Sequence, residues 1–120
     1  TLHIHSAMGE KVDEGMLAAV IVNESIQQIE QECGLSIDVN SLSYSRLLTH
    51  MKYLMARLRE NETLTLDMEE YTKNAFPYSY QVAAHIIERL SRTLNREVPQ
   101  IETGYLAMHI ERVCQNERQA

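Results

Sequence analysis

The sequence predicts an all-α fold, a compact bundle of about five helices. Apolar residues recur at steps of three and four over long stretches, which is the spacing of one helix face. No strand-like alternation of useful length appears in the chain. The 120 residues include only 2 prolines and 4 glycines, which favours helices joined by short loops. A chain of this length forms a single hydrophobic core, so we expect one domain.

The first predicted helix covers residues 15–33. Its apolar face consists of Ala18, Ala19, Val22, Ile26, Ile29 and Cys33. Gly34 follows directly, and we expect the helix to end there because glycine readily adopts the left-handed conformation of a C-terminal cap. Residues 8–15 are polar and poorly periodic, and we interpret them as a linker. Residues 1–7 are too short for a domain and are expected to end the last helix of a preceding module.

The middle of the chain predicts one long and one short helix. Asp38 and Asn40 are residue types that cap helix N-termini, and a helix from about residue 41 to residue 60 is expected after them. The apolar face of this helix contains Leu47, Met51, Leu54, Met55 and Leu58. Residues 61–63, Asn-Glu-Thr, form a polar break, and a shorter helix is expected over residues 66–73.

The last two predicted helices each follow a proline. Pro77 suits the first turn of a helix, where its missing N–H group costs nothing, and Pro99 repeats this arrangement. The fourth helix carries an apolar stripe of Tyr80, Ala83, Ile87, Leu90 and Leu94. The core face of the fifth helix consists of Leu106, Ile110 and Val113. Residues 117–120 are expected to form a tail.

Composition and charge restrict the classes of function. The formal net charge is −6 and the 11 Lys and Arg residues are scattered, which argues against direct binding of RNA or DNA. The chain has no apolar run of about 18 residues and no leader resembling a signal peptide, so we expect a soluble, cytoplasmic protein without membrane contact. Cys33 and Cys114 belong to no CxxC pair. We interpret them as small apolar residues in a reducing compartment rather than as a disulfide.

His50 is predicted to lie at the rim of the core on the second helix. At about 100° per residue, it falls roughly 60° to one side of the apolar stripe. Arg46, Tyr53 and Arg57 share this edge, so that arginine, histidine, tyrosine and arginine follow one another along it. Guanidinium groups so placed lower the pKa of an imidazole and attract anions.

His109 occupies an equivalent position on the fifth helix, roughly 60° from its core stripe. Its edge neighbours are Glu102, Tyr105 and Arg112. By contrast, His85 lies about 180° from the apolar face of the fourth helix and is expected to be solvated and without a role. Two helices thus each present one rim histidine with a tyrosine and an arginine one turn away.

A neutral imidazole beside arginine suits a side chain that accepts a phosphoryl group, because the planar guanidinium binds phosphate oxygens in a fork. Two other interpretations stay open. Both histidines could be ordinary boundary residues, or His50, His109 and Glu102 could converge on zinc. The zinc interpretation is weaker, since no tight motif such as HExxH is present and neighbouring arginines repel a cation. No glycine-rich phosphate loop, GxSxG elbow or Cys-His nucleophile pair occurs, so we expect no enzyme, cofactor or metal site.

Two segments of the chain resemble a known family. SYSRLLTHMKYLMARL (residues 43–58) and PQIETGYLAMHIERV (residues 99–113) are similar to the PTS regulation domain, or PRD, of bacterial transcriptional antiterminators of the BglG/SacY type. The resemblance implies a five-helix bundle and covers nearly all of the chain from the linker onward. The first residues, TLHIHSA, resemble the end of such a domain. The resemblance therefore implies that residues 1–7 end a first PRD, that residues 8–15 are a linker, and that residues 16–116 are the second PRD of a tandem pair.

The resemblance also implies regulation by histidine phosphorylation. In this family the sugar phosphotransferase system phosphorylates two histidines in each domain, through the phosphocarrier protein HPr or a sugar-specific enzyme II component. The RxxxH motif matches His50, the GYxxxHI motif matches His109, and His3 matches the second site of the preceding domain. The candidate phosphate partners are Arg46, Arg57, Arg112 and Tyr105.

Family members of this type usually form homodimers, and they bind RNA through a separate N-terminal domain that lies outside this chain. The resemblance thus implies a non-enzymatic module in which phosphorylation shifts dimerisation and so controls RNA binding in transcription antitermination. Three alternatives stay open. They are the same module in a DNA-binding transcriptional activator regulated by the phosphotransferase system, a phosphotransfer enzyme, and a helical scaffold without phosphorylation.

Overall fold

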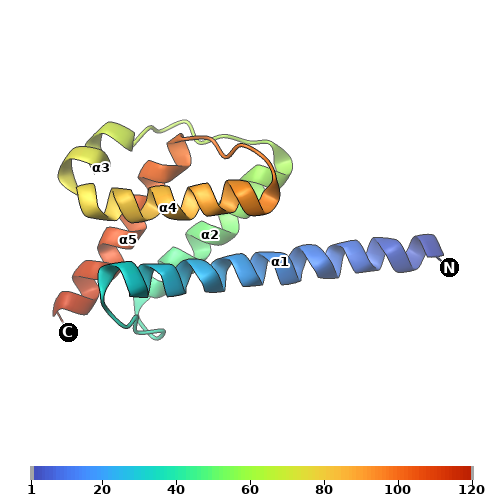
Figure 1. The fold of residues 1–120 in the computed structure, drawn as a ribbon, viewed down its shortest axis with the longest axis horizontal. Helices are drawn as coiled ribbons and strands as arrows, with labels where there is room; N and C mark the ends of the chain where they lie inside the picture. The colour runs from blue at the N-terminus through green and yellow to red at the C-terminus, as the bar shows by residue number, and fades with distance from the viewer. Residues whose placement is uncertain (1, 120) are drawn as a thin grey trace.

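The computed structural model describes the backbone of residues 2–119 and the side chains of residues 15–118. Within these residues the chain forms five α-helices and no β-strand, so the all-α prediction is confirmed. The helices are α1 (Leu2–Cys33), α2 (Leu42–Glu60), α3 (Glu69–Ala75), α4 (Pro77–Leu94) and α5 (Ile101–Gln119). Helix α5 packs against α2, α3 and α4, and α1 packs against α2 and α4. In Figure 1, α2 and α5 cross behind α1 and α4.

Helix α1 begins earlier than the sequence predicts. The sequence predicts a start at Gly15 after a linker, but the helix is continuous from Leu2 to Cys33. Residues 8–15 contain two glycines, each of which costs only about 1 kcal/mol relative to alanine inside a helix, and no proline interrupts them. The expected break in the helix is therefore wrong, whereas the domain boundaries stay predictions. The backbone of His3 lies in α1, and its side chain is outside the described part of the chain.

Left-handed backbone residues end α1 and α2, and a serine side chain begins α2. Gly34 has a φ of 65°, and α1 ends directly before it, as predicted. Ser41, rather than Asp38 or Asn40, is the N-cap of α2, because its Oγ accepts a backbone N–H of the first turn at 3.1 Å. Asn61 has a φ of 56° and closes α2, which confirms the polar break.

The starts of the remaining helices differ slightly from the predictions. The sequence predicts α3 over residues 66–73, but it runs from Glu69 to Ala75. Asp67 explains the shift, since its Oδ1 accepts the first backbone N–H of α3 at 2.9 Å and so satisfies a free donor at the helix start. Pro77 is the first residue of α4, as predicted. Pro99 lies just before α5 rather than in its first turn.

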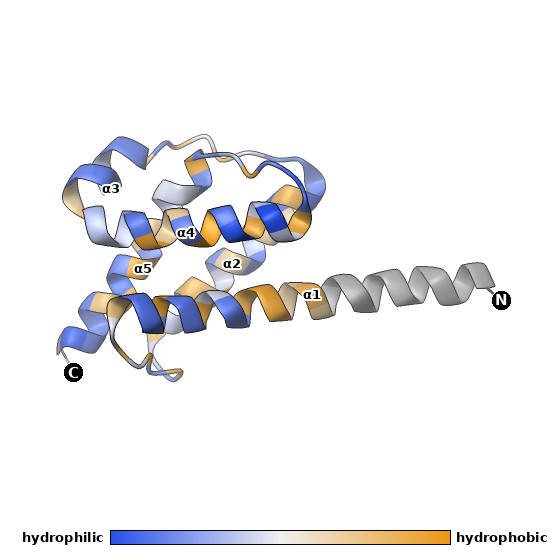
Figure 2. Ribbon diagram, viewed as in Figure 1, coloured by the Kyte–Doolittle hydropathy of each residue, from blue (hydrophilic) through white to orange (hydrophobic). Residues whose placement is uncertain are grey.

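The predicted apolar stripes of α4 and α5 form the centre of the core. Among their residues, those that are buried are Ala83, Ile87, Leu90, Leu106, Ile110 and Val113. Tyr80 and Leu94 are only half-buried, near the two ends of α4. Val82 and Ile86 are also buried, because α4 packs against both α1 and α5 and so needs a wider apolar face. Figure 2 shows apolar and polar residues alternating along α4.

Gly104 lets α5 approach α3 closely. A Cβ atom at this position would lie 2.8 Å from the backbone nitrogen of Glu69 and 2.8 Å from the carbonyl carbon of Met68. Both atoms belong to the backbone and cannot move aside as a flexible side chain would, so the contact requires glycine. This contact holds the part of α5 that carries Tyr105 against the bundle.

The two cysteines are packing residues. Cys114 belongs to the hydrophobic core, and Cys33 is half-buried against it. Both are free thiols, which agrees with the interpretation from the sequence. Within the described helices, none combines the length and the apolar character that a membrane crossing requires.

Candidate functional site

Helices α2 and α5 bring His50 and His109 together. The centroids of the two imidazole rings are 4.5 Å apart, and the ring planes differ by 33°. The ring of Tyr105 on α5 lies parallel to the His50 ring, with centroids 6.2 Å apart and planes within 1°. Three rings from two helices thus form one group, which we call the histidine cluster.

His50 lies deeper than the sequence predicts. Only 8% of its surface is exposed, whereas His109 is half-buried. The predicted rim position follows from the angle around a single helix axis, but the burial of His50 depends on α5, which places His109 and Tyr105 against its ring. The rim position is therefore wrong for His50 and correct for His109.

Burial keeps both imidazoles neutral. It is the largest cause that lowers the pKa of His50 from 6.5 to about 3, followed by the influence of His109 and Arg57. Burial also lowers the pKa of His109, with smaller contributions from the positive charges of Arg112 and Arg46. Each ring therefore keeps an unprotonated nitrogen near neutral pH. A neutral histidine of this kind can act as a nucleophile or as a base.

The histidine cluster lines a groove of about 410 Å³. Arg46 and Arg57, from the predicted edge of α2, line the same groove. Arg46 is exposed, and no acidic side chain within residues 15–118 forms an ion pair with it. Arg112 is also exposed and acts on His109 through its charge. The guanidinium group of Arg46 is therefore available to an anion in the groove.

Arg57 is bound by a buried carboxylate. Its Nε and Nη2 donate to the two carboxylate oxygens of Glu102 at 2.8 and 2.7 Å. The Glu102 side chain is 1% exposed and that of Arg57 is 16% exposed. Both oxygens of Glu102, the zinc ligand considered from the sequence, therefore accept hydrogen bonds from Arg57. Among the described side chains, no group of three or more His, Cys, Asp or Glu residues is arranged to hold a metal ion.

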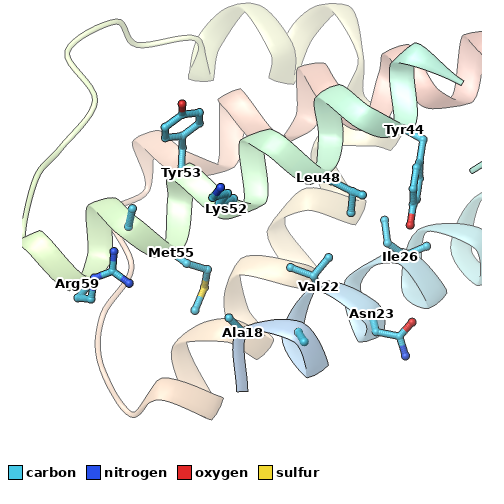
Figure 3. A pocket seen from close by; sticks show the side chains of 12 residues that line it. Ala18, Val22, Asn23, Ile26, Tyr44, Leu48, Lys52, Tyr53, Met55 and Arg59 are labelled. Atoms are coloured by element: carbon cyan, nitrogen blue, oxygen red, sulfur yellow. The ribbon is translucent and has the colours of Figure 1, made fainter. Parts of the chain in front are cut away.

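Two other features lie apart from the histidine cluster. His85 is exposed on α4, as predicted, and its Nδ1 lies 2.8 Å from Oε1 of Glu32. A larger groove, of about 560 Å³, lies between α1 and α2 and is lined mainly by apolar side chains. Figure 3 shows Val22 and Ile26 of α1 facing Leu48 of α2 across this groove. It contains no histidine.

The PRD domain family matches residues 23–113, a range that includes both histidines of the cluster and all four candidate phosphate partners. The chain belongs to the PRD domain family. The resemblance seen in the sequence is thereby confirmed for the domain itself. The position of this PRD domain as the second of a tandem pair stays a prediction.

Relatives of the PRD domain include named antiterminators. The chain is 32% identical over 117 residues to the GlcA/glcB genes antiterminator of Staphylococcus carnosus (strain TM300), covering 95% of this chain and 41% of the relative. It is 28% identical over 116 residues to the PtsGHI operon antiterminator of Bacillus subtilis (strain 168), covering 93% and 41%. Protein GlcT of Staphylococcus aureus (strain Newman) is 29% identical over 112 residues, covering 91% and 40%. The chain thus spans about two fifths of the length of these relatives.

Proposed function

We propose that this PRD domain is a regulatory module that accepts phosphoryl groups on His50 and His109 from the sugar phosphotransferase system. The observation that carries the proposal is a pair of neutral imidazoles, 4.5 Å apart, in a groove that also holds the guanidinium group of Arg46. A phosphoryl acceptor needs an unprotonated nitrogen, space for the phosphate, and a cation that binds its oxygens. The groove supplies all three.

The candidate phosphate partners have different roles in this proposal. Arg46 lines the groove without an acidic partner among the described side chains, and it binds the phosphate. Arg112 adds positive charge beside the histidine of α5. Arg57 stays with Glu102, because breaking a buried pair of this kind costs about 3–5 kcal/mol. The hydroxyl group of Tyr105 is a further donor at the groove.

Phosphorylation would act on the assembly of the protein. A phosphohistidine brings close to two negative charges to a site that now holds neutral rings, and this favours one arrangement of a dimer over another. We propose that the protein is a homodimer. Exposed apolar side chains on α1, at Met16, Leu17 and Val20, support this, since such patches mark protein–protein contacts. Figure 2 shows the apolar stretch in this part of α1.

The proposal extends to the protein that contains this domain. Relatives carry the names GlcA/glcB genes antiterminator and PtsGHI operon antiterminator. We assign the same role here: the PRD domain controls transcription antitermination by a separate N-terminal RNA-binding domain and has no enzymatic activity of its own. The formal charge of −6 supports the assignment of RNA binding to a separate domain, because it disfavours RNA binding by this segment. The phosphoryl donors, HPr and an enzyme II component, place the protein in the cytoplasm.

Phosphoryl transfer in vitro tests the proposal. The purified chain is incubated with phosphoenolpyruvate, enzyme I and HPr, with and without an enzyme II component, and its intact mass is measured. We expect an acid-labile gain of one phosphate per acceptor histidine. His50→Ala and His109→Ala should each remove one such gain, and His85→Ala, at an exposed histidine, should keep both. No gain with either donor, in a reaction where HPr itself is phosphorylated, would refute the proposal.

A further inference from the structure

Each of the two imidazole rings in the histidine cluster has one buried, unpaired nitrogen. Among the described side chains, His50 Nε2 and His109 Nδ1 are buried polar atoms without a hydrogen-bond partner. Buried polar atoms in native proteins are nearly always paired, so two unpaired nitrogens in one cluster require an explanation. We call these two atoms the closed nitrogens. The closed nitrogen of His50 is the ring nitrogen far from the backbone, and that of His109 is the ring nitrogen near the backbone.

The other nitrogen of each ring has a different environment. Among the described side chains, His50 Nδ1 and His109 Nε2 are not among the buried polar atoms that lack a hydrogen-bond partner. Both rings line the groove of about 410 Å³. The groove has room for a phosphoryl group, whereas the closed nitrogens are buried, in an interior where proteins are usually close-packed. Attachment at a closed nitrogen would push the phosphate between the ring and the core.

This arrangement determines the tautomer of each ring. A neutral imidazole carries one N–H group and one lone pair, so a ring that attacks from the groove keeps its proton on the closed nitrogen. His50 Nε2 and His109 Nδ1 are then both donors, and two donors cannot bond to each other. Among the described side chains, neither atom has a hydrogen-bond partner, although the two ring centroids are only 4.5 Å apart.

We infer that the two histidines carry their phosphoryl groups on different ring atoms, Nδ1 in His50 and Nε2 in His109. The inference rests on the proposed function for its role in regulation, while the choice of atom rests on the geometry of the rings. In the transfer, the lone pair of the groove-side nitrogen forms a bond to phosphorus. The bond between phosphorus and the donor breaks, and its electron pair stays with the donor. The closed nitrogen keeps its proton, so the ring becomes a phosphorylated imidazolium whose positive charge is balanced by the negative charge of the attached phosphoryl group.

Chemical phosphorylation with phosphoramidate tests the inference without a protein donor. An imidazole lone pair attacks the phosphorus of phosphoramidate, and ammonia leaves with the electrons of the broken P–N bond. The chain, with isotope-labelled histidine nitrogens, is treated in the folded state and, as a control, unfolded in urea. NMR correlations among ring protons, ring nitrogens and phosphorus distinguish the two phosphohistidine isomers. His50→Gln and His109→Gln variants assign each signal to its residue.

In the folded chain we expect the Nδ1 isomer at His50 and the Nε2 isomer at His109. Each should exceed the other isomer at least about tenfold, because a phosphoryl group at the closed nitrogen overpacks the core. The unfolded chain should give the same mixture at both positions. The reverse isomers, or no reaction at either ring while the exposed His85 reacts, would overturn the inference. Failure of HPr and of the enzyme II component to label the chain would overturn the proposed function alone.

Discussion

Mild acid should destabilise this domain through His50. In the folded domain, burial and then the influence of His109 and Arg57 lower the pKa of His50 from 6.5 to about 3. The unfolded chain binds a proton at His50 as the pH falls through 6.5, whereas the folded domain binds it only near the lower value. Above pH 6.5, His50 therefore does not affect the free energy of unfolding. As the pH falls from 6.5 toward about 3, this free energy decreases progressively.

The size of the loss follows from the two pKa values. Between about pH 7 and about pH 5, the proton bound only by the unfolded chain lowers the free energy of unfolding by about 2 kcal/mol. The lowered pKa of His109 acts in the same direction. Domains of this size are stable by about 5–15 kcal/mol in total, so the loss from one side chain is a substantial part of the whole.

Urea unfolding followed by circular dichroism at the two pH values measures this loss. His50→Gln removes the titrating group and should reduce the loss by about 2 kcal/mol. His85→Gln removes an exposed histidine of α4 outside the histidine cluster and serves as the comparison variant. The reasoning is refuted if the His50→Gln variant loses as much stability between the two pH values as the native domain does.

Three substitutions, with Gly15→Ala as a control, test the packing that supports the site. Gly104→Ala should destabilise the domain by about 1–3 kcal/mol, because the added Cβ meets the backbone of α3 at 2.8 Å. Gly15→Ala, with nothing within 4 Å, should be neutral or stabilising, and equal melting temperatures for the two variants would contradict the close approach. Glu102→Gln should cost about 3 kcal/mol in urea unfolding, since Arg57 loses its buried partner, and an unchanged midpoint would show that the pair contributes nothing. Leu54→Ala should lower the free energy of unfolding by about 2–5 kcal/mol through the cavity that it leaves, and a loss below about 1 kcal/mol would contradict the burial of this residue.

Apolar spacing predicts which residues face the core but not how deeply their neighbours are buried. Leu47 and Leu54 are buried, as their spacing on one helix indicates. The same spacing places His50 at the rim, where the structure has it buried. An angle around one helix axis contains no information about the side chains that another helix brings opposite, and here Tyr105 and His109 come from α5.

The ion pair of the site shows the same limit. The sequence places Arg57 and Glu102 on the two edges that carry the histidines, so both are expected near the site. Their pairing depends on how α2 and α5 pack against each other, and this is a property of the whole bundle. The sequence contains one signal for this pair: a basic residue, Arg57, lies on the edge of one predicted helix that carries a histidine, and an acidic residue, Glu102, lies on the corresponding edge of another.

The predicted start of α1 is wrong for a local reason. Gly15 and the polar residues before it predict a break, but a glycine weakens a helix by only about 1 kcal/mol. Propagation of a helix that has already formed is favourable for most additional residues, so isolated weak positions such as Gly9 and Gly15 do not stop it. A glycine in the left-handed conformation, in contrast, does end a helix. Gly34 has this conformation and follows the last residue of α1, where the sequence predicts the end.

The parallel contact between Tyr105 and His50 gives the domain an internal spectroscopic reporter. Electrons circulating in an aromatic ring shift the NMR signals of protons that lie near its face. The ring of His50, with its carbon-bound protons, has its centroid 6.2 Å from that of Tyr105 and 4.5 Å from that of His109. These shifts exist only while α2 and α5 stay in contact, because separation of the helices returns the signals to those of a free imidazole. Opening and closing of the site can therefore be followed in the native sequence, without an attached dye or tag.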